Sequence, residues 1–318
     1  MNKKISVVIP IYNEAQNISL LLPQLIEVMQ NISGAGEYEV ICIDDGSTDG
    51  SFTELKYFQD KEKSLKVIRL KRNFGQTAAI AAGFEKAEGQ VIVTMDADLQ
   101  NDVSDIPGLL SEINNGVDVV SGWRKIRKDP FLARRLPSNT ANKIISWFTG
   151  VKLHDYGCTL KAYKKDVVKD LHLYGELHRF IPALLSWSGA SIKEIPVKHH
   201  PRKYGKSKYS ICRTLNVILD LITVKFLLSR DKGPMRIFGR LGSWSIAAGS
   251  LAGIITIVMK AVYRKDMTGN PLLYLSIFLV FVGLQFISMG LLGEINIRTY
   301  MEGQNKRIYQ IKEILTDE

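Results

Sequence analysis

The stretch VIVTMDADLQND, residues 91–102, raises the question that decides the fold. It begins as an apolar run typical of a buried strand and leads directly into Asp96, Asp98 and Asp102. Carboxylates at the end of a buried strand are either solvated turn residues or ligands that hold a cation against an anionic group. The surrounding sequence has to separate these two interpretations.

Residues 1–207 alternate apolar strand patterns with amphipathic helix patterns. Continuous apolar strands separated by helices indicate a mostly parallel sheet with helices on both faces. We therefore predict an α/β, Rossmann-like domain over this range. Its expected strands are ISVVIP (5–10), YEVICIDD (38–45), LKVIRL (65–70), QVIVTMDA (90–97) and VDVVSGW (117–123).

Polar side chains gather where these strands end, at Pro10, Asp44, Asp45, Asp96 and Asp98. In a parallel sheet the carboxyl ends of the strands form one edge, where ligands bind. Asp96 and Asp98 are two apart in a strand-like segment, so we expect both side chains on the same side. Carboxylates suit Mg²⁺ or Mn²⁺, which usually bind through one or two of them together with substrate phosphates.

The second half of the chain predicts a membrane anchor over residues 237–293. Residues 241–259 and 267–293 contain no charged side chain, and each run is long enough to cross a hydrocarbon core about 30 Å thick. The preceding segment, 208–236, has an amphipathic pattern that suits either a helix lying on the membrane surface or a half-buried helix of the soluble domain. Residues 294–318 are expected to be a cytosolic tail.

The basic composition favours a membrane partner over nucleic acid. The net charge is +10, but the basic residues cluster at 124–135 and 198–213 and flank the apolar segments, with no RNA-binding aromatic signature between them. Basic residues beside a membrane segment meet lipid phosphates. Cys42, Cys158 and Cys212 lack the spacing of a zinc site or a disulfide framework, which indicates a reducing compartment.

The sequence also predicts the location of the domain. The apolar run near the N-terminus is too short for a signal peptide, so we expect the N-terminus to stay in the cytosol. Two spans return the chain to its starting side, and basic residues flank the spans slightly more than they occupy the connecting loop. We expect a multi-pass protein of the inner membrane with its first domain facing the cytosol.

Several motifs together resemble the family 2 glycosyltransferases of the GT-A fold, which use a divalent cation and a nucleotide-sugar. Further motifs narrow the resemblance to polyisoprenyl-phosphate glycosyltransferases, especially the bacterial undecaprenyl-phosphate branch that includes the aminoarabinose transferase. The resemblance covers nearly the whole chain. The motifs are VVIPIYNE (7–14), IDDGSTDGS (43–51), RNFGQTAAIAAGF (72–84) and MDADLQND (95–102), then DYGCTLKAYKKDVV (155–168), KYGKSKYS (203–210) and MGLLGEINIRTY (289–300).

The resemblance implies a donor site at the strand ends. Pro10, Tyr12 and Glu14 match residues that cup the nucleotide base and ribose. Asp45 matches an aspartate that accepts a hydrogen bond from the base, and Gly75 is expected to bring its backbone close to the donor.

The same resemblance implies a metal and catalytic site. Asp96, Asp98 and Gln100 match the shell of the metal and diphosphate, where a cation would stabilise the leaving nucleoside diphosphate. Asp155 matches an acid proposed near the anomeric carbon, where it either orients the sugar or stabilises developing positive charge. The predicted catalytic residues are therefore Asp96, Asp98 and Asp155. A helix-capping role for Asp155 is the alternative, and the neighbouring His154 is interpreted as structural.

Cationic positions are expected to hold the lipid phosphate, because arginine suits bidentate phosphate contacts and lysine supplies a point charge. The resemblance assigns this role to Arg124, Arg134, Ser138, Arg202 and Lys208.

The predicted function is an inverting transfer of a sugar from a nucleotide-sugar, expected to be UDP-linked, to undecaprenyl phosphate at the cytosolic leaflet. The resemblance also implies homo-oligomers formed through the membrane segments. One alternative is a processive polysaccharide synthase, although the QxxRW motif of those enzymes is absent. The other is a non-catalytic, membrane-tethered protein that binds a nucleotide-sugar.

Overall fold

The computed structural model describes residues 4–33, 37–125, 142, 145–146, 149–169, 171, 173, 175, 177–201, 234–264, 266–267, 269–303 and 311–315. The chain forms two compact units. One comprises Met1–Leu221 together with Arg307–Glu318, and the other is Ile222–Lys306.

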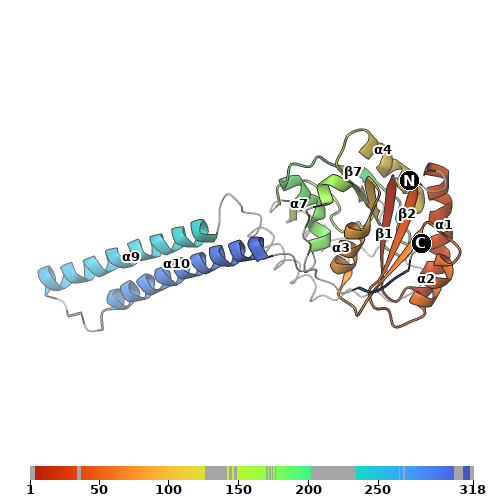
Figure 1. The fold of residues 1–318 in the computed structure, drawn as a ribbon. Helices are drawn as coiled ribbons and strands as arrows, with labels where there is room; N and C mark the ends of the chain where they lie inside the picture. Colours follow the sequence, from red (N-terminus) through yellow and green to blue (C-terminus); the bar gives the residue numbers. More distant parts are fainter. Residues whose placement is uncertain are drawn as a thin grey trace. The chain divides into compact units, whose positions relative to one another are not determined.

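The first unit is built on an eight-stranded sheet in the order β7-β5-β6-β4-β1-β2-β3-β8 (Figure 1). β1 pairs in parallel with β2 and β4, β2 with β3, and β5 with β7, while β6 and β8 run antiparallel to their neighbours. The prediction of a mostly parallel sheet is confirmed. The strands are β1 (Ile5–Ile11), β2 (Tyr38–Asp44), β3 (Leu65–Leu70), β4 (Val91–Thr94), β5 (Val119–Trp123), β6 (Lys161–Lys164), β7 (Ile192–Pro196) and β8 (Ile311–Leu315).

Helices cover both faces of this sheet because its strands alternate buried apolar side chains toward each face. Val7 and Ile9 of β1 belong to one core cluster with side chains of α1 and α4, whereas α3 packs against β1 and β2 from the opposite face (Figure 1). The helices of this unit are α1 (Ala15–Ser33), α2 (Ser51–Gln59), α3 (Gln76–Lys86), α4 (Ile106–Asn114), α6 (Lys165–Val168) and α7 (Ile181–Trp187), with 3-10 turns η1 (Val103–Asp105) and η3 (Leu177–Phe180).

The fourth strand corrects one prediction. β4 ends at Thr94, so the acidic segment that follows is not strand-like. Leu99 has a φ of 59°, in the left-handed region that non-glycine residues seldom occupy. Asp96 and Asp98 therefore lie in a bent loop, and the period-two argument for their orientation was wrong.

The segment predicted as a tail, 294–318, contributes a strand to the first unit. Ile311–Leu315 form β8, which pairs antiparallel with β3 at the edge of the sheet. The chain therefore comes back to its first domain after the second unit.

The second unit contains two long helices, α9 (Pro234–Tyr263) and α10 (Pro271–Gly303). Met235–Tyr263 and Pro271–Asn296 are long and apolar enough to span a membrane. Their outward side chains include large apolar groups, such as Phe281, whose exposed fraction is 70%. The predicted segment 208–236 lies outside the described residues except for its last three.

Small residues allow α9 and α10 to pack closely. A Cβ added to Gly249 would lie 2.9 Å from the backbone oxygen of Ser276, and one added to Gly283 would lie 2.7 Å from the backbone oxygen of Gly242. The Ser276 hydroxyl also donates to the Gly249 carbonyl at 2.7 Å. Close backbone approach through small residues is the way helices associate inside lipid, where burial of apolar surface gives no advantage.

Candidate active site

In an open α/β sheet the crevice that binds ligands lies outside the carboxyl ends of neighbouring strands, here those of β1 and β4. Their pairing stops at Val8 and Thr94, followed by one hydrogen bond from the Met95 N–H to the Val8 carbonyl at 3.2 Å. The chain order reverses here, because β2 and β3 lie on one side of β1 and β4 lies on the other. Ligands of open α/β sheets bind at such a switch point. The backbone polar groups of Pro10 point toward β4, as those of Val8 do, because the two residues are two apart in a strand. Pairing with β4 has already ended there, so the missing N–H of Pro10 removes no hydrogen bond between strands.

Two loops on the β2 side of the crevice are joined by hydrogen bonds. The Asn13 N–H donates to the Ser47 hydroxyl at 3.0 Å, and its side-chain oxygen accepts from the Thr48 N–H at 2.8 Å. The Glu14 N–H donates to the Ser51 hydroxyl at 2.8 Å. The structure thus brings together the segments predicted to bind the nucleotide, with Tyr12 partly buried between strand and loop.

Asp45 fixes the loop that leads into α3. Its two carboxylate oxygens accept from the N–H groups of Phe74, at 2.7 Å, and Gly75, at 2.9 Å. Gly75 has a φ of 94°, which only glycine adopts readily, and an added Cβ would meet no atom within 4 Å. Glycine is therefore required here by backbone conformation. The predicted contacts of Asp45 and Gly75 with the donor stay predictions.

Asp96 and Asp98 lie in the loop that directly follows the carboxyl end of β4. Gln76, the first residue of α3, donates from its side-chain nitrogen to Asp96 at 2.8 Å. Asp98 is buried and accepts from the Gln100 N–H at 3.1 Å. Burial and the neighbouring Asp98 raise the pKa of Asp96 to about 6. A carboxyl group whose charge is disfavoured by burial and by a neighbouring carboxylate favours a cation at this place.

These residues fit a divalent cation. In the part of the chain that the structure describes, no group of three or more His, Cys, Asp or Glu side chains is arranged to hold a metal by itself. Mg²⁺ and Mn²⁺ usually bind through one or two carboxylates and complete their shell with water and substrate phosphates. Asp96 and Asp98 supply such a pair, and the Gln100 N–H donates to Asp98.

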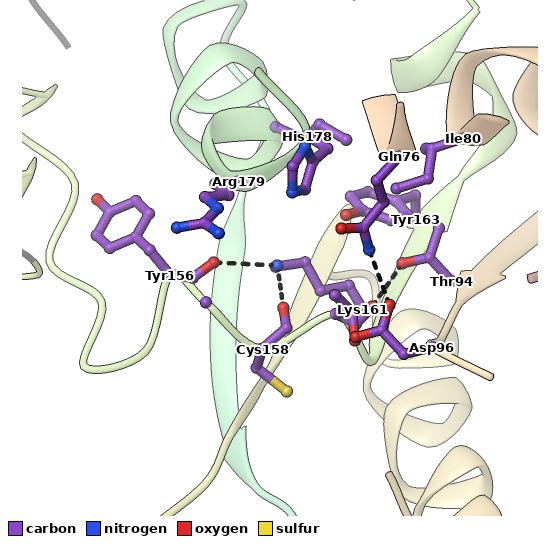
Figure 2. A pocket seen from close by; sticks show the side chains of 13 residues that line it. Gln76, Ile80, Thr94, Asp96, Tyr156, Cys158, Lys161, Tyr163, His178 and Arg179 are labelled. Atoms are coloured by element: carbon purple, nitrogen blue, oxygen red, sulfur yellow. Dashed lines mark hydrogen bonds between the residues drawn. The ribbon is translucent and has the colours of Figure 1, made fainter. Parts of the chain in front are cut away.

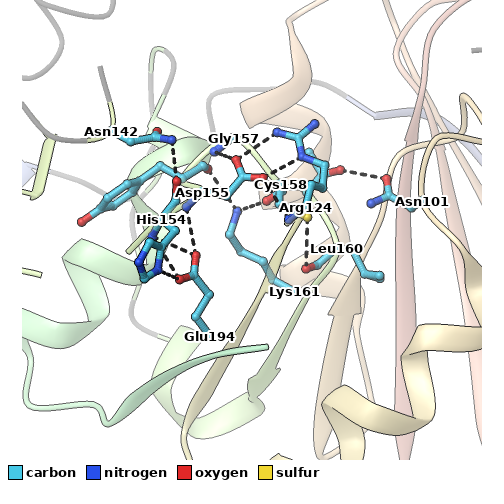
Figure 3. A network of polar contacts seen from close by, with 12 residues as sticks. Asn101, Arg124, Asn142, His154, Asp155, Gly157, Cys158, Leu160, Lys161 and Glu194 are labelled. Carbon is cyan, nitrogen blue, oxygen red and sulfur yellow. Dashed lines mark hydrogen bonds and ion pairs between the residues drawn. The ribbon is translucent and has the colours of Figure 1, made fainter. Parts of the chain in front are cut away.

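Asp155 and Arg124 form a buried ion pair on the other side of the crevice (Figure 3). Arg124 Nε donates to Asp155 Oδ2 at 2.7 Å, and Nη2 donates to Oδ1 at 3.0 Å. The Asp155 side chain is 1% exposed and also accepts from the Gly157 N–H at 3.2 Å. Two parallel, charge-assisted hydrogen bonds from the guanidinium therefore fix the orientation of the Asp155 carboxylate.

Glu194, which the sequence analysis did not single out, fixes this loop from β7 (Figure 3). Its carboxylate accepts from the N–H of Asp155 at 2.9 Å and of His154 at 3.0 Å, and it lies 2.7 Å from His154 Nδ1. The His154 ring stacks on Trp123 at the end of β5 with 4.4 Å between centroids. The structural role of His154 stays a prediction.

A polar pocket adjoins Asp96 (Figure 2). Lys161 of β6 lies under it with its Nζ hydrogen-bonded to the carbonyl oxygens of Cys158 and Tyr156. His178 and Arg179 of η3 line the opposite wall, and His178 Nδ1 lies 2.7 Å from the Thr77 hydroxyl of α3. The sequence analysis did not identify Lys161, His178 and Arg179 as site residues, because nothing in the sequence distinguishes them from other basic side chains.

Most predicted ligands of the lipid phosphate lie outside the described residues. This applies to Arg134, Ser138, Arg202 and Lys208. Arg124 is described, and it lies close enough to Asp96 for its charge to lower the pKa of that carboxyl, an effect smaller than that of burial, which raises it.

Comparisons with known proteins extend this picture. Residues 6–172 match the family described as Glycosyl transferase family 2. Dodecaprenyl-phosphate galacturonate synthase of Rhizobium johnstonii is 40% identical over 322 residues, which cover 99% of this chain and 94% of that protein. Undecaprenyl-phosphate 4-deoxy-4-formamido-L-arabinose transferase of Shewanella sediminis is 36% identical over 316 residues, 99% of this chain and 93% of that protein.

Solved structures share the fold at low sequence identity. Glucosyl-3-phosphoglycerate synthase of Mycobacterium tuberculosis, crystallised with Mn²⁺ and UDP-glucose, aligns with a TM-score of 0.56 at 14% identity over 70% of this chain and 79% of that chain. Mannosyl-3-phosphoglycerate synthase of Rubrobacter xylanophilus gives 0.58 at 13% identity over 70% and 74%. These are GT-A glycosyltransferases, which confirms the predicted fold class.

The strand-end crevice, its paired carboxylates and the two apolar helices therefore occur in a chain that matches polyprenyl-phosphate sugar transferases over its full length. The chain belongs to glycosyl transferase family 2, as an enzyme of the polyprenyl-phosphate sugar transferase type with a GT-A catalytic domain.

Proposed function

We propose that this enzyme transfers a sugar from a UDP-linked donor to undecaprenyl phosphate at the cytosolic leaflet of the inner membrane, with inversion at the anomeric carbon. The observation that carries the proposal is the β1–β4 switch point, where Asp96 and Asp98 directly follow the end of β4. The relatives named for galacturonate and for formamido-arabinose do not agree on one sugar, so the comparisons leave its identity open.

The donor half of the site would bind the nucleotide between the loops that follow β1 and β2. Pro10, Tyr12 and Glu14 would contact base and ribose, and Asp45 would hold Gly75 in the conformation that lets the diphosphate approach. The hydrogen bond from Gln76 orients Asp96. Bound Mg²⁺ or Mn²⁺, held by Asp96, Asp98 and Gln100, would neutralise charge on the departing diphosphate.

The acceptor half would be organised by Arg124 and Asp155. An acceptor phosphate is already an anion, so its attack on the anomeric carbon needs no strong base. The bidentate ion pair supports a positioning role for Asp155, which would hold the Arg124 guanidinium toward an anionic acceptor. Single displacement by this phosphate oxygen would invert the anomeric carbon. Arg134, Ser138, Arg202 and Lys208 would add to the phosphate site.

The membrane arrangement follows from the path of the chain. β8 returns to the sheet that contains β1, so the two ends of the helical hairpin have to reach the same compartment. If both helices span the bilayer, the catalytic domain and the C-terminal strand share one side, which we propose is the cytosol.

The test is glycolipid formation by protein purified in detergent. We would supply undecaprenyl phosphate, Mg²⁺ or Mn²⁺ and a panel of UDP-sugars, and compare wild type with Asp98→Asn. We expect a monoglycosylated lipid phosphate that depends on the metal and is lost in the variant. A polymeric product would indicate a processive synthase, and UDP binding without any product would indicate a non-catalytic binding protein. Either outcome would contradict the proposal.

A further inference from the structure

The pocket beside Asp96 is lined by basic side chains to which the proposed function assigns no role. Its lining contains Lys161 and Arg179 as cations, His178 as a third nitrogen base, and Asp96 as the carboxylate (Figure 2). Gln76 joins the pocket to the metal site through its hydrogen bond to Asp96. An anionic group placed here would lie next to the proposed diphosphate site.

Lys161 is the least expected member of this lining. It is 3% exposed, and its Nζ contacts two backbone carbonyl oxygens of the loop between Asp155 and β6. Burial is the largest influence on this group and lowers the pKa of Lys161, because desolvation disfavours the charged ammonium. An anion bound in the pocket would favour the charged form and offset that cost.

The opposite wall is fixed in place. The buried His178 contacts Thr77 at 2.7 Å, which ties η3 to the first turn of α3. Arg179 follows in the same 3-10 turn and is only half-buried, so it faces the pocket on a rigid support. An arginine fork on such a support matches the planar geometry of a carboxylate.

We propose that this pocket binds a carboxylate carried by the donor sugar, so that the substrate class is a nucleotide-linked uronic acid or another acidic sugar. The proposal rests on the proposed function. It favours a singly charged carboxylate over a doubly charged phosphate, because the charges of the carboxylate and of Asp96 together balance those of Lys161 and Arg179. A dianion would leave one negative charge in excess beside Asp96. The carboxylate would set sugar specificity and take no part in bond formation.

The experiment compares donors that differ at one carbon. UDP-galacturonate is paired with UDP-galactose, and UDP-glucuronate with UDP-glucose, each with undecaprenyl phosphate and Mn²⁺. We expect the wild type to prefer the better uronate over its neutral partner by roughly tenfold to a hundredfold in kcat/KM, the size of a hydrogen bond between charged groups. Arg179→Gln should abolish most of this preference by lowering kcat/KM for the uronate much more than kcat/KM for the neutral sugar. Arg179→Lys should keep part of it.

Lys193→Gln is the matched control, because it removes an exposed cation that pairs with Glu112 away from the pocket. It should leave the preference between donors unchanged. Circular dichroism and the Tm of each variant establish that the fold is intact.

Three outcomes would overturn the pocket assignment. One is equal use of uronate and neutral donors by the wild type. Another is an equal loss for both donors in Arg179→Gln, and the third is a rise confined to the KM for undecaprenyl phosphate, which would assign Arg179 to the lipid phosphate. Absence of product from every donor would instead contradict the proposed function. In that case the affinity of each UDP-sugar is measured by its competition with bound UDP. A higher affinity for the UDP-uronates than for the neutral UDP-sugars would support the pocket assignment, and equal affinities would overturn it.

Discussion

The two ends of the central sheet both contain buried carboxylates, but the protein treats them differently. At the amino end, Glu39 accepts from the Ser6 hydroxyl and the Glu88 N–H, both at 2.6 Å, and its other oxygen lies 2.9 Å from Lys66 Nζ. Its side chain is completely buried. Donors and a counter-charge from the protein itself surround this carboxylate.

At the carboxyl end, Asp96 and Asp98 lie close together, and the pKa of Asp96 is raised to about 6 by burial and by its neighbour. A buried carboxylate such as Glu39, whose donors and counter-charge come from the protein, contributes to stability. A carboxylate such as Asp96, which burial and a like charge still destabilise, favours the binding of a cation. We infer that the first arrangement was selected for stability and the second for binding a cation.

The largest effect is expected from Asp98→Asn. Turnover should fall by roughly a thousandfold, because electrostatic stabilisation of the leaving group depends on the cation that this carboxylate helps to hold. The Tm should stay the same or rise, because the variant removes one of two mutually repelling charges. The rate of glycolipid formation measures turnover, and thermal unfolding measures the Tm. A marked loss of stability with normal turnover would show that Asp98 contributes to stability and not to catalysis, which would contradict the comparison.

Arg124→Gln tests whether a buried carboxylate stabilises the fold because a counter-charge neutralises it, whichever end of the sheet it occupies. Asp155 lies at the functional end but is neutralised by Arg124. Removing the partner of a buried charge should cost about 3 kcal/mol of unfolding free energy. The double variant Arg124→Gln with Asp155→Asn should recover most of that stability and still transfer sugar poorly, as urea unfolding and turnover would show. If the double variant is as unstable as the single one, the ion pair is not the cause.

Glu39→Gln probes the amino end. It should lower the unfolding free energy by about 2 kcal/mol, because Lys66 loses a charged partner and the Ser6 and Glu88 donors meet a weaker acceptor. Turnover per folded molecule should remain normal. A specific loss of activity at unchanged stability would show that the amino end also contributes to catalysis.

The smallest effect concerns pH. In metal-free protein the folded state binds more protons than the unfolded state between the pKa of a free aspartate, about 4, and the raised pKa of Asp96, about 6. Asp96 should therefore make folding less favourable as pH rises through this window. Relative to Asp96→Asn, wild-type protein in EDTA should lose stability from about pH 4 to pH 7, and Mn²⁺ with UDP should reduce that loss. A constant difference between the two proteins across this range would contradict the raised pKa.

The sequence predicted β1 to β5 because long apolar runs define them locally. It missed β6, which reads KAYK, and also β7 and β8, which read IKEIP and IKEIL. β7 and β8 occupy the two opposite edges of the sheet, where lysine and glutamate disfavour further pairing between molecules. Five residues with two charges give a weak local signal, and only pairing with a distant strand fixes their place.

The sequence predicted the site residues that directly follow a strand, but it did not predict contacts between residues that are far apart in the chain. Asp96 and Asp98 follow an apolar run and were found in this way. The partnership of Asp155 with Arg124 joins positions 31 residues apart, because β5 and β6 bring their flanking loops together. The sequence analysis assigned Arg124 to the lipid phosphate and Asp155 to the region of the anomeric carbon, without a contact between them. Lys161 and Arg179 were not singled out because burial depends on the assembled fold.

Binding of Mn²⁺ in the presence of UDP tests the central claim most directly. Calorimetric titration of wild type, Asp98→Asn and Glu39→Gln, each folded at the measuring temperature, separates the two ends of the sheet. The account predicts one tight site per chain in wild type and Glu39→Gln, and a loss of roughly a hundredfold or more in affinity in Asp98→Asn. Equal affinity in all three proteins would show that the carboxylates at the end of β4 do not hold the cation.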